Sequence, residues 1–245
     1  MTETLKKTRS EFGLSLFVII ISGTSASLLI FPPLGIVSYL GFTYGAIIPS
    51  IITIFAIGII FRKKFARLSN GIFAGMVSGA IATFALEAVR IPGYMFLRWI
   101  PMDSMISLPG LLVTGKISSL MEVKKVVMSS GIPMHLYHAP LEPFMAGALW
   151  HFWNGASFGV IYCIILGRAK WFYGMIFAAA IEMGMMLAPY MVMMKGPFGV
   201  NYMDGYNLFV ITMAAHLVFG SVLGIMAKKL VKEGGSIATL RHKQG

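Results

Sequence analysis

The chain alternates long apolar runs with short polar segments. A hydrocarbon core about 30 Å thick is crossed by about 20 apolar residues of helix, and six runs approach or exceed that length. We predict membrane spans at roughly residues 12–31, 38–61, 71–91, 143–166, 171–192 and 207–227. The pattern therefore predicts an all-α, polytopic membrane protein in which residues 1–245 form a single membrane domain.

The segment between the third and fourth runs, residues 92–142, is too long for a simple connector. It contains several prolines and the amphipathic stretch KISSLMEVKKVVMSS. An amphipathic helix of this kind lies in the plane of the membrane interface. We expect an outer interfacial cap here, either a shield over the bundle or a lid over a site.

The distribution of basic residues predicts the orientation of the chain in the membrane. Hydrophobic residues make up 57% of the chain, the mean hydropathy is +0.80 and the net charge is +11. The basic residues flank the apolar runs rather than forming an aromatic-interleaved patch, so the bilayer is the expected partner and nucleic acid is not. With a cytoplasmic N-terminus, fourteen of the 20 Lys and Arg residues fall on the inner side. The positive-inside rule thus predicts a multi-pass protein of the cell membrane with both termini in the cytoplasm.

A repeat runs through the last four predicted spans. The third and fifth carry two small residues and a glutamate spaced four apart: Gly79, Thr83 and Glu87, and Gly174, Ala178 and Glu182. The fourth and sixth carry a histidine and two glycines at the same spacing: His151, Gly155 and Gly159, and His216, Gly220 and Gly224. Residues four apart share one helix face, and small residues there let transmembrane helices approach closely. The second helix pair is therefore predicted to echo the first.

The ionisable members of this repeat need another explanation. Counting 1.5 Å per residue places His151, His216 and Glu182 about 12–14 Å below the outer edge of the hydrocarbon, and Glu87 about 6 Å below it. Such residues are costly in a membrane unless they face the protein interior and find a partner. We predict that they share one pocket in the outer half of the bilayer.

Two histidines and two carboxylates form a donor set suited to iron, copper, manganese or zinc. The leading hypothesis is a transition-metal site made by His151, His216, Glu182 and Glu87, because a divalent cation would stabilise both carboxylate and neutral imidazole. A dry pocket with an open metal position suits redox chemistry. The chain would act on a lipid-soluble or extracytoplasmic substrate, alone or as one subunit of a larger membrane complex.

Three alternatives stay open. His151 and His216 could be the two axial ligands of a b-type haem held between antiparallel helices. The chain could instead be a small membrane transporter or a substrate-binding subunit. In the third alternative the role is purely structural: Glu182 bonds to a histidine, Glu87 pairs with Arg90, and these contacts only hold the helices together. Whether the chain is an enzyme is left open. His135 and His138 in the predicted cap are interpreted as polar surface that could gate the site, carry protons or recruit metal from outside, and not as direct metal ligands.

Overall fold

The computed structural model describes residues 3–97, 104–131, 139–201 and 205–232. Within these ranges the chain forms helices and turns and no strand, which confirms the all-α prediction. The helices are α1 (Glu3–Ser22), η1 (Ala26–Leu29), α2 (Tyr39–Phe42), η2 (Thr43–Ile47), α3 (Ile48–Ile60), α4 (Ala66–Leu97), α5 (Ser104–Val113), α6 (Leu120–Ser129), α7 (Leu141–Ile165), α8 (Phe172–Met186), α9 (Pro189–Lys195), η4 (Pro197–Gly199) and α10 (Asn207–Leu230).

Four helical segments of the described chain are long and apolar enough to cross a membrane. They are Tyr39–Ile60, Ala66–Gly93, Leu141–Ile165 and Asn207–Leu230. A fifth crossing results if α8 and the segment Pro189–Gly199 count as one span, although the two are bent by 57°. The predicted membrane character is thus supported, whereas the predicted number of six spans is not confirmed.

The first predicted span, residues 12–31, differs most from the structure. The helix α1 begins earlier and ends at Ser22, before a run of small polar residues. Thr24 Oγ1 donates to Ile21 O at 2.8 Å, and Ser27 Oγ donates to Gly23 O at 2.9 Å. Ser and Thr side chains that bond nearby carbonyls compete with helical geometry. The chain therefore continues only as the short η1 turn and irregular backbone.

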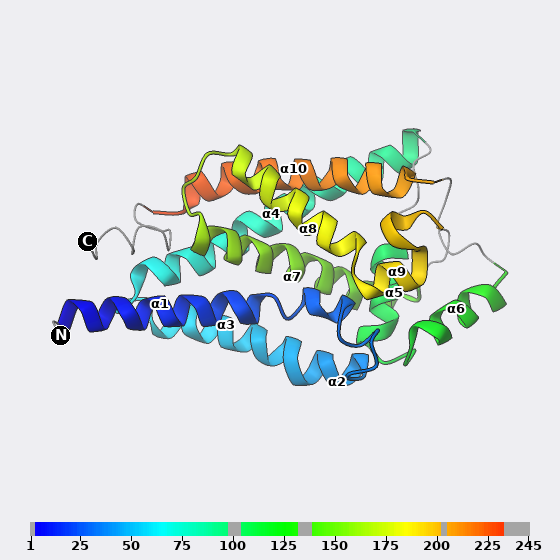
Figure 1. Cartoon of the computed structure of the whole chain (residues 1–245), viewed down its shortest axis with the longest axis horizontal. Coiled ribbons are helices and arrows are strands. Elements are labelled where there is room, and N and C mark those ends of the chain that lie inside the picture. The colour runs from blue at the N-terminus through cyan, green and yellow to red at the C-terminus, as the bar shows by residue number, and fades with distance from the viewer. Residues whose placement is uncertain (1–2, 98–103, 132–138, 202–204, 233–245) are drawn as a thin grey trace.

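The arrangement of the long helices is visible in Figure 1. The helix α1 begins, and α10 ends, at the same end of the bundle, while α5, α6 and α9 lie at the opposite end. The helix α4 packs along both α7 and α10, and α8 packs chiefly against α10. Both α7 and α10 run from the α5–α6 end toward the other, so these two helices are parallel.

The region predicted as a cap packs partly into the helix bundle. The helix α4 continues through Pro92 to Leu97, which lengthens the third span beyond the predicted 71–91. The helix α6 is amphipathic as expected, with Val123 fully buried and Met128 78% exposed. The helix α5 instead packs against α7 with Leu108 fully buried. Residues 92–142 thus contribute to the bundle interior as well as to its surface.

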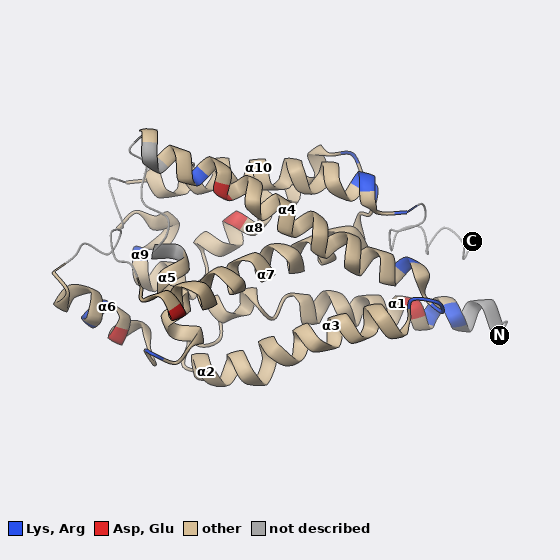
Figure 2. Ribbon diagram, turned by 180° about the vertical axis from the view of Figure 1, so that it is seen from behind, with Lys and Arg blue, Asp and Glu red and all other residues tan. Residues whose placement is uncertain are grey.

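Basic residues gather at one end of the bundle. Figure 2 shows most of the Lys and Arg residues near the start of α1 and the end of α10. One ion pair there joins α1 to the start of α4, with Arg67 Nε 3.1 Å from Glu11 Oε1. Asn70 Oδ1 accepts a hydrogen bond of 2.8 Å from Lys232 N, which ties the end of α10 to α4. The basic end is thus also a region of interhelical polar contacts.

The small residues of the repeat bring two helix pairs into backbone contact. A Cβ atom added to Gly79 of α4 would overlap the carbonyl oxygen of Gly155 of α7. In the same way, a Cβ atom on Gly174 of α8 would overlap the carbonyl oxygen of Gly220 of α10. The predicted repeat is thus confirmed as two helix pairs, α4–α7 and α8–α10, each joined by its own small-residue groove.

Candidate functional site

The first helix pair carries a glutamate bound to a histidine and an arginine. Glu87 Oε1 on α4 lies 2.8 Å from His151 Nε2 on α7. The same oxygen accepts a hydrogen bond of 2.9 Å from Arg90 Nη1, one turn further along α4. The side chains of Glu87 and Arg90 are only 12% and 5% exposed. The expected pairing of Glu87 with Arg90 is therefore present.

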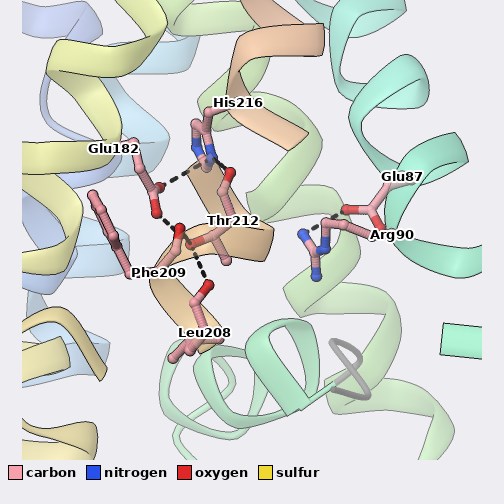
Figure 3. A network of polar contacts seen from close by, with 7 residues as sticks. All are labelled: Glu87, Arg90, Glu182, Leu208, Phe209, Thr212 and His216. Carbon is pink, nitrogen blue, oxygen red and sulfur yellow. Dashed lines mark hydrogen bonds and ion pairs between the residues drawn. The ribbon is translucent and has the colours of Figure 1, made fainter. Parts of the chain in front are cut away.

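The second helix pair repeats this contact. Glu182 on α8 is fully buried, and its Oε2 lies 3.0 Å from His216 Nδ1 on α10. Thr212 Oγ1, one turn before His216, donates a hydrogen bond to Glu182 Oε1. Figure 3 shows these three side chains clustered between α8 and α10. Glu182 thus lies within ion-pair distance of a histidine, as expected, although its Oε2 has no hydrogen-bond partner of good geometry among the described residues.

The four predicted site residues therefore form two carboxylate–histidine pairs. In each pair the groove of small residues sets the helix spacing, and the ionisable groups meet further along the same faces. Glu87 lies level with His151, although counting from the predicted span end placed it nearer the surface. The helix α4 extends past residue 91, so Glu87 lies further from the end of its helix than the predicted span implied, and the predicted depth in the membrane stays a prediction.

A cavity of about 300 Å³ lies between the two pairs. Most of its wall is apolar and comes from α4, α7, α8, α9 and α10, with Trp150, Phe158 and Phe219 among the lining side chains. The wall also contains polar residues: Thr83, Arg90, His151, Asn154, Tyr190, Lys195, Thr212 and His216. Both predicted histidines therefore line one cavity, whereas the described lining includes neither Glu87 nor Glu182.

The cavity has a mouth on the side of the bundle. Ile30, Ala180 and Gly184 line the cavity and are also exposed, so they mark this mouth between the η1 segment and α8. The surrounding face of α8 is apolar, with Ile176 61% and Leu187 51% exposed. An exposed apolar surface on a membrane-type helix faces hydrocarbon. The mouth therefore opens laterally rather than at an end of the bundle.

Aromatic side chains fill the gap between α7 and α8 on the side of the cavity toward the basic end. The ring centroid of Phe177 on α8 lies 5.4 Å from that of Tyr162 and 6.5 Å from that of Phe158, both on α7. Beyond these rings α8 packs chiefly against α10 rather than α7. The cavity thus occupies the part of the α7–α8 gap that Phe177 does not fill.

The hydrogen bonds define how the histidines present their rings. His216 Nδ1 lies 2.9 Å from the carbonyl oxygen of Thr212 as well as 3.0 Å from the Glu182 carboxylate. Both neighbours are acceptors, so Nδ1 carries a proton and Nε2 is the nitrogen left for another partner. In His151 the proton lies on Nε2, which donates to the Glu87 carboxylate, and Nδ1 is the nitrogen left for another partner.

Sequence reasoning missed four residues of this site. Thr212 lies one turn from His216, a spacing that could have identified it, and Arg90 was considered only as a partner of Glu87. Lys195 lies beyond the fifth predicted span, residues 171–192, but it is 1% exposed and lines the cavity. Asn154 carries a buried Oδ1 that has no hydrogen-bond partner among the described residues. Asn154 lies four residues after Trp150 in an apolar run, and no motif there indicated a role in a site.

The described residues do not bring the four metal candidates together as predicted. Among them, no group of three or more His, Cys, Asp or Glu side chains is placed to hold a metal ion. The haem hypothesis assumed antiparallel helices, whereas α7 and α10 run in the same direction. His135 and His138 lie outside the described residues.

Comparisons of the chain with family models, with curated proteins and with solved structures gave no match.

Proposed function

We propose that this protein binds a small lipid-soluble molecule in the cavity between α4, α7, α8 and α10, as a transporter or as the substrate-binding subunit of a membrane complex. The observation that carries the proposal is the lateral mouth of a largely apolar cavity that has a few polar groups in its wall. Cavities of about 300–1,000 Å³ with an apolar lining and few polar groups are typical ligand sites. A ligand dissolved in the bilayer reaches such a mouth without crossing water.

Two features support a bound ligand over a purely structural role. Native interiors are close-packed, and a cavity of this volume is larger than a packing defect. The Asn154 Oδ1 atom is buried in the wall without a partner among the described residues, and buried polar atoms normally have one. The amide would have to turn toward the cavity for a ligand or an ordered water molecule to satisfy it, because Oδ1 itself is inaccessible. The Glu87–His151 and Glu182–His216 pairs then hold two histidines in fixed orientations beside the bound molecule.

We also propose that the basic end of the bundle faces the cytoplasm of the cell. The connections at that end contain Arg62, Lys63, Lys64, Arg168 and Lys170. Short basic connections mark the cytoplasmic side of multi-pass proteins. The cavity is then in the outer half of the bilayer, and α6 lies on the outer surface.

Photolabelling tests the proposed binding. The purified protein in nanodiscs is irradiated with a diazirine-bearing dodecane, and the labelled residues are mapped by mass spectrometry. We expect saturable labelling of the wall residues Trp150 and Met185. The variant Gly184→Leu places a side chain in the mouth, where a Cβ atom meets no other atom, and should suppress this labelling.

The matched control is Gly13→Leu, because Gly13 is exposed on α1 and a Cβ atom there also meets no other atom. This variant should label like the wild type. Labelling spread along all lipid-facing helices, equal in both variants and not saturable, would contradict the proposal.

A second candidate function is metal or haem-iron binding by the histidines, with the carboxylates in a supporting role. Histidines that bind metals usually donate their other ring N–H to a carboxylate or carbonyl group, as His151 and His216 do here. Iron, copper, manganese or zinc would then be held by His151 Nδ1 and His216 Nε2 with ligands from the substrate or solvent. Redox chemistry would follow from the bound metal.

Elemental analysis and an absorption spectrum of the purified protein test this candidate. A stoichiometric metal, lost in both His151→Ala and His216→Ala, would support an ion, and a Soret band would support haem. Metal and haem contents that are negligible in the wild type or unchanged in both variants would exclude the candidate.

A further inference from the structure

The charges around the cavity are unevenly distributed. The basic residues Arg90 and Lys195 belong to its wall, together with the two histidines. The carboxylates of Glu87 and Glu182 do not line it; each is held on the far side of a histidine. A ligand in the cavity therefore meets N–H donors and cationic groups before it meets any carboxylate of the described chain.

The two basic residues come from different helices, Arg90 from α4 and Lys195 from α9. Arg90 extends from α4 toward the Glu182–Thr212–His216 cluster while its Nη1 contacts Glu87 (Figure 3). A guanidinium has five N–H donors in a planar fork, so it can bind a second acceptor while it keeps Glu87. Lys195 ends α9, at the α5–α6 end of the cavity, and is 1% exposed.

The remaining wall is suited to an alkyl or isoprenoid chain. Leu29, Leu86, Ile181 and Met185 line the cavity, and Ile30 stands at the mouth. A ligand whose polar group reaches Arg90 therefore leaves its apolar part against these side chains and pointing toward the mouth. The cavity thus has a cationic inner wall and an apolar passage to the bilayer.

Resting on the proposed binding function, we infer that the ligand is an anionic amphiphile: a single carboxylate or phosphate group on an apolar chain, which enters from the bilayer through the mouth at Ile30, Ala180 and Gly184. The anion binds between Arg90 and Lys195, with Thr212 and the histidines as further hydrogen-bond partners. The chain lies along the apolar wall. A cavity of about 300 Å³ holds one such molecule rather than a two-chain phospholipid.

Quenching of Trp150 fluorescence tests the inference, because Trp150 lines the cavity. The full-length protein in zwitterionic nanodiscs is titrated with 9,10-dibromostearic acid, its methyl ester and a bromoalkyl phosphate. Hydrogen bonds to charged groups are strong enough to give a preference of about tenfold. We expect both anions to quench at concentrations about tenfold lower than the ester. A Trp150→Phe variant identifies the signal that belongs to the cavity.

Two sets of variants identify the groups responsible. Lys195→Met and the double variant Glu87→Gln/Arg90→Gln should each reduce the preference for the anion over the ester. The double variant removes both members of the ion pair and so leaves neither charge buried alone. Thermal unfolding of each variant confirms that it is folded.

The outcomes separate the two proposals. If Gly184→Leu blocks quenching but acid, phosphate and ester bind equally well, the cavity binds ligands and the inference of an anion is wrong. If Gly184→Leu blocks nothing, the binding function itself is wrong. A preference for only one of the two anions identifies whether the headgroup is a carboxylate or a phosphate, and either result upholds the inference.

Discussion

At the scale of single residues, the structure gives each intramembrane carboxylate a defined set of partners. Glu87 is shared by Arg90 and His151, and Glu182 by Thr212 and His216. Burying an ionisable residue in a membrane is costly unless it faces the protein interior and finds a partner. These carboxylates meet both conditions. Their side chains thus position the two histidines that line the cavity.

Thr212 should contribute measurably to stability, because it donates to the buried Glu182 carboxylate. The variant Thr212→Val keeps the shape and removes this donor, and leaving a buried acceptor unsatisfied costs about 1–3 kcal/mol. We expect a lower unfolding temperature in detergent. Ser221→Ala is the control on the same helix, since Ser221 Oγ bonds only Leu217 O. Equal effects of the two variants would contradict the assigned role.

Glu122 on α6 should make the stability of that helix depend on pH. Its carboxylate accepts hydrogen bonds of 2.8 Å from the backbone N–H and the hydroxyl of Ser118, and these bonds lower the pKa of Glu122 below its ordinary value. Ser119 Oγ accepts from Glu122 N in return and caps α6. The contribution is therefore complete at neutral pH and is lost as the pH falls below about 4.3 and through the lowered pKa.

Hydrogen exchange of the Val123 amide measures this dependence. Protection should fall through that acidic range in the wild type and vary less in Glu122→Gln, which cannot ionise. Identical pH profiles in the two proteins would show that the carboxylate does not hold the start of α6.

At the scale of helices, the sequence predicted pairing faces better than it predicted helix ends. The spacing of small residues identified the faces that meet, because close helix approach in membranes requires small side chains. The end of α1 and the extension of α4 through Pro92 were missed. The end of α1 depends on competition between side-chain and backbone hydrogen bonds, and the extension of α4 depends on packing around a proline. The length of an apolar run predicts neither. A shared pocket was predicted, but its lateral mouth was not, because the mouth depends on how α8 packs relative to α7.

The small-residue grooves predict a sharp contrast within one helix. Gly174→Ala forces a methyl group into the backbone of α10, and overpacking of this kind typically costs about 1–3 kcal/mol. Gly184→Ala meets open space and should be neutral or slightly stabilising, since alanine favours helix by about 0.8–1.0 kcal/mol over glycine. Thermal unfolding of both variants provides the test. A Gly174→Ala protein as stable as Gly184→Ala would mean that the α8–α10 groove is not closed.

At the scale of the whole molecule, the bundle has a basic end, a lateral mouth and a cavity wall with hydrogen-bond donors. The orientation can be tested by thiol labelling, because Cys163 is fully buried and should react little with a maleimide. A Met121→Cys protein, with its new thiol on the exposed face of α6, should react in intact cells with a membrane-impermeant maleimide. A Lys63→Cys protein should react only after permeabilisation. The reverse result would invert the topology and place the cavity in the inner half of the bilayer.

The most direct test of the central claim is native mass spectrometry of the full-length protein released from nanodiscs. We predict one small hydrophobic adduct per protein in the wild type and in Gly13→Leu, and its loss in Gly184→Leu. A wild-type protein without an adduct, or adducts of equal abundance in all three proteins, would contradict a ligand held in the cavity between α4, α7, α8 and α10.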